Sequence, residues 1–253
     1  FYTQGIASVD LNNDYYPELY MTNSWKGFDN HFYNNLESTY LKDTVSFKLR
    51  DKYFSNGCAF ADLNNDGVLD LCLANSDNNY NTVLFGNKNH RYTEQLMDTN
   101  ATNWSYSTAI ADADNDGVVE VYISNYFSQK NILYRINGNE FIKIDSTEIT
   151  IDTSSTLFST WSDLNNDGLQ DLIVCNDSKN YMFRNEGNFV FTRINNDFSI
   201  DNKITYGCSV ADYNNDGLMD IFITNWSGKN CLFKNDGNFK FEKLNIRPFN
   251  FDY

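Results

Sequence analysis

A nine-residue acidic segment recurs five times along the chain and constrains its fold more than any other feature. The last copy, residues 212–220, reads Asp-Tyr-Asn-Asn-Asp-Gly-Leu-Met-Asp. Successive copies are separated by 52, 50, 51 and 49 residues. A fixed period of this size is the sequence signature of a repeat architecture. The copies, called the acidic segments below, begin at Asp10, Asp62, Asp112, Asp163 and Asp212.

Each acidic segment carries oxygen-bearing side chains at positions 1, 3, 5 and 9, and four of the five have glycine at position 6. Hard cations such as Ca²⁺ bind roughly six to eight oxygen atoms from carboxylates, amides and main-chain carbonyl groups. We therefore predict up to five Ca²⁺ sites, in which position 7 contributes its carbonyl oxygen. The predicted ligands are Asp10, Asn12, Asp14, Tyr16 and Glu18; Asp62, Asn64, Asp66, Val68 and Asp70; Asp112, Asp114, Asp116, Val118 and Glu120; Asp163, Asn165, Asp167, Leu169 and Asp171; and Asp212, Asn214, Asp216, Leu218 and Asp220.

The acidic segments differ from the EF-hand, which needs a bidentate Glu at position 12 and a helix on each side. Position 12 is apolar in every copy, and the flanking residues lack helical spacing. Ordinary Asp/Asn/Gly turns between strands are the alternative. Five copies with the same four oxygen positions favour metal binding over such turns. The first copy is the least regular, with Tyr15 at position 6 and Pro17 at position 8.

Short apolar or alternating stretches around each acidic segment predict four strands per repeat. In the fifth repeat the predicted strands are 206–211, 221–224, 231–233 and 239–244, with a turn at 235–238. Four-stranded units of about 50 residues are typical of β-propeller blades, and a solenoid of sheets is the alternative. The predicted fold is therefore all-β, a β-propeller of about five four-stranded blades that form either a closed ring or part of a larger one. We assign 1–253 to a single domain, with repeats at approximately 1–50, 51–101, 102–151, 152–200 and 201–253.

Composition restricts the classes of partner. The formal net charge is −15, and 16 of the 34 acidic residues lie in the acidic segments. This balance argues against nucleic acid, whose binding needs a basic surface. No polybasic patch or run of about 18 apolar residues is present, so we expect no insertion into a membrane. Because the chain begins at Phe1, we expect a processed or trimmed product, which can be one segment of a larger chain or assembly.

The five cysteines are an odd number, so at least one has no partner for an intrachain disulfide. Cys58 and Cys208 occupy the same repeat position, four residues before an acidic segment, where a small buried side chain is expected. We favour free buried thiols over a Cys58–Cys208 bridge. The absence of a Cys-x-x-Cys pair argues against zinc.

The repeats resemble a known family. Residues 206–212 read Tyr-Gly-Cys-Ser-Val-Ala-Asp and residues 220–223 read Asp-Ile-Phe-Ile, a pattern that resembles the FG-GAP repeat, also described as the VCBS-type repeat. Residues 55–62 are a weaker copy, and residues 131–135 and 180–185 are similar to a turn segment common in bacterial members. The resemblance implies a β-propeller like the integrin α-subunit head, with Ca²⁺ in the loops between first and second strands. It also implies secreted or surface proteins that adhere to proteins or glycans. Integrin-like propellers have more blades than the five repeats found here.

Extracellular modules with oxygen sites of this kind bind Ca²⁺ with a Kd of about 10⁻⁴ to 10⁻³ M, so the sites fill outside a cell. We therefore predict an extracellular or cell-surface adhesion module that binds a glycan or a protein. No catalytic motif is found, and enzymatic activity is not expected. A structural module of a larger surface protein or filament, and a carbohydrate-active enzyme, are the alternatives.

Aromatic residues gather in the connections at the end of each repeat opposite the acidic segments. Trp25 and Trp226 are candidate ligand residues, because exposed aromatic rings suit sugar stacking or a protein contact, and packing under their own loops is the alternative. For Trp104 and Tyr126 packing is favoured. An Asn closes the second strand of every repeat, 13 residues after the first Asp, and a structural role in the following turn is predicted for it. These residues are Asn23, Asn75, Asn125, Asn176 and Asn225.

Overall fold

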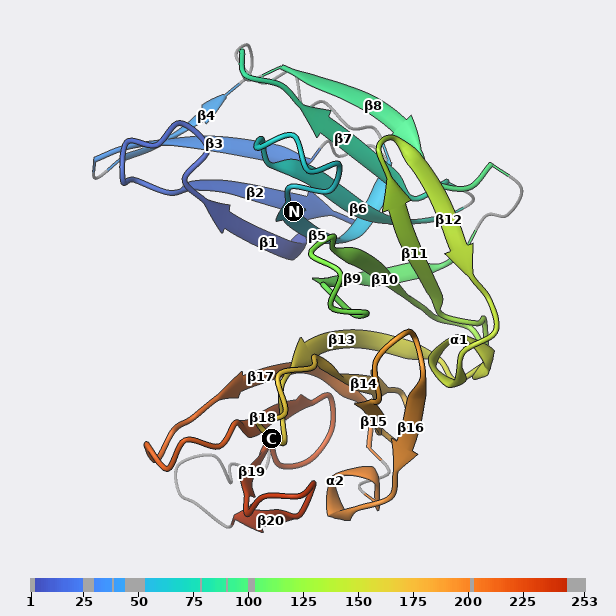
Figure 1. The fold of residues 1–253 in the computed structure, drawn as a ribbon. Coiled ribbons are helices and arrows are strands. Elements are labelled where there is room, and N and C mark those ends of the chain that lie inside the picture. Colours follow the sequence, from blue (N-terminus) through green and yellow to red (C-terminus); the bar gives the residue numbers. More distant parts are fainter. Residues whose placement is uncertain are drawn as a thin grey trace. The chain divides into compact units, whose positions relative to one another are not determined.

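The computed structural model describes residues 3–24, 30–37, 39–43, 53–77, 79–89, 91–99, 103–200 and 203–244. The chain is all-β and consists of five four-stranded antiparallel sheets, the five blades of a β-propeller (Figure 1). The predicted fold class is therefore confirmed. Each sheet lies inside one of the five predicted repeats. The assignment of the whole chain to a single domain stays a prediction.

The strands follow the same order in every blade. The first blade contains β1 (Thr3–Val9), β2 (Glu18–Asn23), β3 (His31–Leu36) and β4 (Thr39–Asp43). The second contains β5 (Phe54–Ala61), β6 (Asp70–Ser76), β7 (Thr82–Gly86) and β8 (Tyr92–Leu96). The third contains β9 (Ser105–Ala111), β10 (Glu120–Asn125), β11 (Ile132–Asn137) and β12 (Glu140–Ile144). The fourth contains β13 (Thr156–Ser162), β14 (Asp171–Asn176), β15 (Tyr181–Asn185) and β16 (Phe191–Ile194). The fifth contains β17 (Thr205–Ala211), β18 (Asp220–Asn225), β19 (Cys231–Asn235) and β20 (Phe241–Leu244).

Two one-turn helices in the connections between blades were not expected from the sequence. They are α1 (Glu148–Ile151) and α2 (Asp197–Ile200). Ile149 of α1 and Phe198 of α2 are buried, so each helix anchors one apolar side chain in a core cluster. A single turn is too short to produce the 3.6-residue periodicity by which helices are recognised. Within the described residues, no helix has the length and apolar character needed to cross a membrane.

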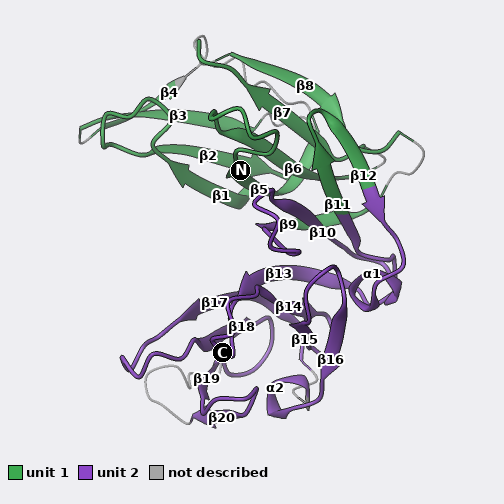
Figure 2. Ribbon diagram, in the orientation of Figure 1, with its two compact units in different colours: residues 1–108, 134–142 green, residues 109–133, 143–253 purple. Residues whose placement is uncertain are grey.

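The chain divides into two compact units, residues 1–108 with 134–142 and residues 109–133 with 143–253 (Figure 2). In the second unit, β14 is buried on both faces. Leu172 and Val174 join one core cluster with Tyr122 of β10, whereas Ile173 and Cys175 join another with residues of β18 and β19. Successive side chains of a strand point to opposite faces of the sheet, so a strand whose four central residues are all apolar fits between two neighbouring blades.

Glycine allows the first strands of neighbouring blades to approach closely in the first unit. A Cβ atom on Gly57 of β5 would lie 2.6 Å from Ser107 Cα of β9. A Cβ atom on Gly5 of β1 would lie 2.6 Å from Asn56 O of β5. Both glycines adjoin an irregularity in the pairing of the first and second strands, and similar register shifts occur in β13 and β17. Glycine is therefore required at this position, because the backbone of the neighbouring strand lies too close to leave room for a side chain.

A repeated chain of hydrogen bonds joins neighbouring blades at the end opposite the acidic segments. Asn180 accepts the N–H of Asn176 (3.0 Å) and donates to Thr205 Oγ1 of the next blade (2.9 Å). Thr205 in turn donates to Asn225 Oδ1 (3.0 Å). The structural role predicted for the Asn that closes the second strand is thereby confirmed. The same bonds link Asn30, Ser55 and Asn75, and link Asn131, Thr156 and Asn176.

Candidate metal-binding loops and an aromatic surface

The acidic segments form the loops between the first and second strands, and the carboxylate at position 1 organises each loop. In the second loop, Asp62 accepts the N–H of Asp66 at Oδ1 (3.0 Å) and that of Gly67 at Oδ2 (2.8 Å). Position 5 continues the pattern, because Asp66 Oδ1 accepts the N–H of Val68 (2.8 Å). These bonds turn the chain around the side chains at positions 1 and 5. The same three bonds are formed in the loops that begin at Asp10, Asp112, Asp163 and Asp212.

Two loop positions require a left-handed backbone. Position 6 has φ between 81° and 88° where it is glycine, and φ 71° at Tyr15 in the first loop. Position 4 is Asn in every loop, with φ between 59° and 63°. Asn tolerates this conformation better than most residues. The role of position 4 was not predicted from the sequence, although Asn in all five copies was the available signal. These residues are Asn13, Asn65, Asn115, Asn166 and Asn215.

Replacing Tyr15 with Gly is expected to stabilise the protein. Tyr15 is 92% exposed, so its side chain contributes little packing. A left-handed backbone costs a residue with a side chain about 1 to 2 kcal/mol, and the greater freedom of glycine in the unfolded chain offsets part of this gain. The expected increase in the free energy of unfolding is about 1 kcal/mol, measured by urea denaturation. Gly168→Ala, the reverse change in a regular loop, should destabilise the protein by a similar amount. If both variants were as stable as the wild type, the prediction would be contradicted.

The side chain at position 9 is buried and closes the loop. Asp171 Oδ2 accepts the N–H of Leu164 at position 2 (2.9 Å), and its Oδ1 accepts the N–H of Asn185 at the end of β15 (2.9 Å). Burial raises the pKa of Asp171 to about 7, and the charges of Asp167 and Asp163 add to this while the two hydrogen bonds oppose it. The carboxyl group therefore ties the loop to the third strand. Equivalent bonds from position 2 are accepted by Glu18, Asp70, Glu120 and Asp220.

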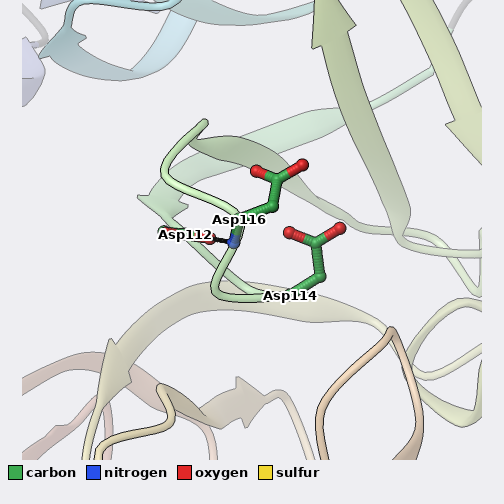
Figure 3. A group of neighbouring side chains, drawn as sticks. All are labelled: Asp112, Asp114 and Asp116. Atoms are coloured by element: carbon green, nitrogen blue, oxygen red, sulfur yellow. Dashed lines mark hydrogen bonds between the residues drawn. The ribbon is translucent and has the colours of Figure 1, made fainter.

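The third loop fits a hard divalent cation best. Carboxylate oxygens of Asp112, Asp114 and Asp116 lie within 4.8 Å of one another. Figure 3 shows the carboxyl groups of Asp114 and Asp116 side by side, with Asp112 bonded to the backbone nitrogen of Asp116. Glu120 accepts the N–H of Ala113 at Oε2 (2.8 Å), while its buried Oε1 has no hydrogen-bond partner among the described residues. Burial raises the pKa of Glu120 to about 7, and the three loop carboxylates add to the shift. A buried carboxylate oxygen without a hydrogen bond is costly, and a cation would offset that cost.

In the second, fourth and fifth loops an Asn stands at position 3. Asn64 Nδ2 donates to Asp66 Oδ2 (3.1 Å), and Asn165 and Asn214 bond to Asp167 and Asp216 in the same way. Asn12 of the first loop donates to Glu18 Oε1 (3.3 Å). In these four loops the amide of the Asn at position 3 therefore bonds to a carboxylate oxygen. In the third loop Asp114 replaces that Asn, so carboxylate oxygens lie close to one another instead. The structure brings the side chains at positions 1, 3 and 5 together in each loop, and their role as Ca²⁺ ligands, with the position 7 carbonyl groups, stays a prediction.

The aromatic candidates have different environments. Trp25 lies outside the described residues. Trp226 follows β18, is 71% exposed and stacks on Tyr206, with ring centroids 5.1 Å apart and planes inclined by 29°. Trp104 packs edge-on against Phe54 at 6.4 Å, as predicted. Tyr126 is half-buried beside Phe127, with ring centroids 4.7 Å apart.

Two polar neighbours of these rings were missed in the sequence analysis. Asp177 and Tyr206 both lie near enough to the Tyr126 hydroxyl to affect its ionisation. Burial raises the pKa of the Tyr126 hydroxyl, and the charges of Asp177 and Tyr206 add to the shift. A signal was present, because Tyr126, Asp177 and Trp226 each follow the Asn that closes the second strand.

All five cysteines are free thiols, as favoured in the sequence analysis. Cys72, Cys175 and Cys231 are buried, whereas Cys58 and Cys208 are half-buried. Burial raises the pKa of Cys58 to about 12, so this thiol is unreactive at neutral pH.

Comparisons with known proteins agree with the repeat structure. The model of the FG-GAP-like repeat matches residues 10–73, 62–123 and 163–223, which together cover more than half of the chain. None of the curated proteins compared with the chain matches it.

The solved structures of similar fold include the following three. A lectin of Agrocybe aegerita that recognises non-reducing terminal N-acetylglucosamine aligns with 97% of this chain and 67% of its own, at 16% identity and a TM-score of 0.66. The V. cholerae biofilm matrix protein Bap1 aligns over 97% of this chain and 40% of its own, at 14% identity and a TM-score of 0.56. BBS1N, in complex with ARL6DN, aligns over 96% of this chain and 68% of its own, at 12% identity and a TM-score of 0.56. At these identities the similarity concerns the fold alone.

Proposed function

Because the chain belongs to the family of FG-GAP-like repeat proteins, we propose that it is an extracellular, calcium-stabilised β-propeller that binds a glycan or a protein. A lectin and a biofilm matrix protein are among the proteins of similar fold, which is consistent with a binding module. The fold hosts many functions, so the proposal depends on the sites rather than on the similarity.

The observation that carries the proposal is the convergence of three carboxylates in the third loop. Asp112, Asp114 and Asp116 hold oxygen atoms within 4.8 Å of one another, close to the buried Glu120. Like charges at this distance repel in the absence of a cation. A bound Ca²⁺ would satisfy these oxygens and fix the loop between β9 and β10, and the other four loops offer related oxygen sets.

The chemistry of these sites supports the proposal of an extracellular location. Oxygen sites of extracellular modules bind Ca²⁺ with a Kd of about 10⁻⁴ to 10⁻³ M. Such sites are filled at the millimolar calcium concentration outside a cell and largely empty inside one. A surface of net negative charge also disfavours nucleic acid as a partner.

A glycan array tests the binding function. We expect the chain to bind a defined group of glycans in 2 mM CaCl₂ (about the extracellular concentration assumed for such modules) and to bind less in excess EDTA. Bovine serum albumin labelled in the same way serves as the control for adventitious signal. If no glycan is bound, a panel of extracellular proteins is screened under the same two conditions. Absence of binding to both panels would contradict the proposed function.

A further inference from the structure

Three successive blades present side chains of complementary chemistry at one repeated position. Fourteen residues after the first Asp of an acidic segment stand Tyr126, Asp177 and Trp226 in the third, fourth and fifth blades. The backbone is anchored at this position, because the N–H of Asp177 donates to Ser155 O (3.0 Å) and that of Trp226 donates to Ile204 O (2.9 Å). The side chains are therefore presented from fixed backbone, all within the unit of residues 109–133 and 143–253.

Trp226 and Tyr206 offer a flat apolar face to solvent. Their rings are stacked, and they are 71% and 46% exposed. Stacking covers one face of the Trp226 indole, and its high exposure leaves the other face accessible. A large exposed aromatic surface of this kind is a common mark of a binding site.

Asp177 supplies hydrogen-bonding capacity from the fourth blade, next to the blade that carries the two rings. Its carboxylate and the Tyr206 side chain both lie near the Tyr126 hydroxyl. An ionised carboxylate has about four lone-pair sites, so Asp177 has acceptor capacity for a ligand. Aromatic faces with an adjacent carboxylate match a molecule that has both C–H groups and hydroxyl groups.

We propose that Trp226, Tyr206, Asp177 and Tyr126 form a carbohydrate-binding site for a pyranose ring. The C–H face of a pyranose would stack on Trp226, and its hydroxyl groups would donate to Asp177. This inference rests on the proposed binding function and specifies its ligand class and place. Four side chains are few compared with a stable protein interface, which has about 20–30 residues on each partner. A nucleic acid would be repelled by Asp177 and by the net charge of −15.

The pyranose site is separate from the acidic segments. The fifth acidic segment ends at Asp220, where β18 begins, whereas Trp226 follows the end of β18 at Asn225. The two ends of a six-residue strand are about 17 Å apart. Ca²⁺ therefore does not contact the sugar, and its effect on binding passes through the stability of the blade.

The test uses saturation-transfer NMR on the intact chain in 2 mM CaCl₂, a concentration of about the extracellular level. The probes are methyl pyranosides of glucose, galactose, mannose and N-acetylglucosamine. We expect at least one pyranoside to bind, and Trp226→Ala to weaken its binding about tenfold or more, as loss of a central aromatic contact does. Trp226→Tyr should restore part of the affinity, and Asp177→Asn should weaken binding with an unchanged melting temperature. Val190→Ala, which removes an apolar side chain that is 56% exposed elsewhere, is the matched control and should leave binding unchanged.

The other possible results show whether the proposed site, its carbohydrate ligand or the proposed function itself is wrong. If a glycan binds in a calcium-dependent way but Trp226→Ala and Asp177→Asn bind it as well as the wild type, the binding function stands and the site is wrong. If none of the pyranosides binds, while an extracellular protein binds and is lost in Trp226→Ala, the carbohydrate assignment is overturned. Failure of the whole protein to bind any glycan or protein would instead overturn the proposed function, and this site with it.

Discussion

Asp171→Ala is expected to lower the free energy of unfolding by about 4 kcal/mol. Asp171 is fully buried and accepts the N–H groups of Leu164 and Asn185, both at 2.9 Å. Its removal leaves two buried donors without an acceptor, and each unsatisfied donor costs about 1 to 3 kcal/mol. The loss would far exceed the effect of a typical substitution, about 1 kcal/mol. Urea denaturation in EDTA measures it without a contribution from bound metal.

Two further variants make the Asp171 test specific. Asp171→Asn keeps one acceptor oxygen, so we expect it to lose about half as much stability as the alanine variant. Asp197→Ala removes an exposed carboxylate at the start of α2, where no such pair of backbone bonds is formed in the described structure, and it should cost less than about 1 kcal/mol. A loss below about 1 kcal/mol for Asp171→Ala would contradict the role assigned to position 9.

Removal of calcium is expected to destabilise the protein by about 3 to 9 kcal/mol in total. A ligand that binds only the folded state stabilises it by RT ln(1 + [L]/Kd), which for 2 mM Ca²⁺ and a Kd of about 10⁻⁴ to 10⁻³ M is about 0.6 to 1.8 kcal/mol per site. Five acidic segments give the total, provided that all of them bind. Differential scanning calorimetry in 2 mM CaCl₂ and in excess EDTA measures the change as a shift in melting temperature.

Magnesium and a loop variant serve as controls for the calcium effect. Mg²⁺ requires octahedral geometry and keeps its water ligands, so it should raise the melting temperature less than Ca²⁺ does. A variant with Asp112, Asp114 and Asp116 changed to Asn should lose the calcium-dependent stabilisation of one site and keep that of the other sites. A melting temperature that is the same in CaCl₂ and EDTA would contradict the calcium role.

The blades could be predicted from the sequence because their determinants are local. The acidic segments, their spacing and the apolar stretches around them fix four strands per repeat, and the Asn that closes each second strand was assigned a structural role. Asn176 shows why this works, because its bonds to Asn180 and Thr156 involve residues of its own blade. The blade fold is therefore encoded within each repeat.

The buried role of position 9 and the nearness of Asp177 to Tyr126 could not be predicted in the same way. In the sequence, Asp171 cannot be distinguished from the other acidic residues of its loop. Its bond to Asn185 forms only when two strands pair, because the two residues are 14 apart in the sequence. Asp177 and Tyr126 are neighbours only because the fourth blade packs beside the third, which brings residues 51 apart in the sequence near each other. Contacts between blades depend on tertiary packing, which periodicity within one repeat does not report.

Equilibrium dialysis against calcium tests the central claim most directly. The intact chain is first stripped with a chelator, then dialysed at free Ca²⁺ concentrations from about 10⁻⁵ to 10⁻² M, a range that spans the expected Kd. We expect saturable binding of up to five Ca²⁺ ions per chain, one for each acidic segment. At least one ion should be lost when Asp112, Asp114 and Asp116 are changed to Asn. Absence of saturable binding over this range would contradict calcium binding by the acidic segments, which would then be only turns between strands.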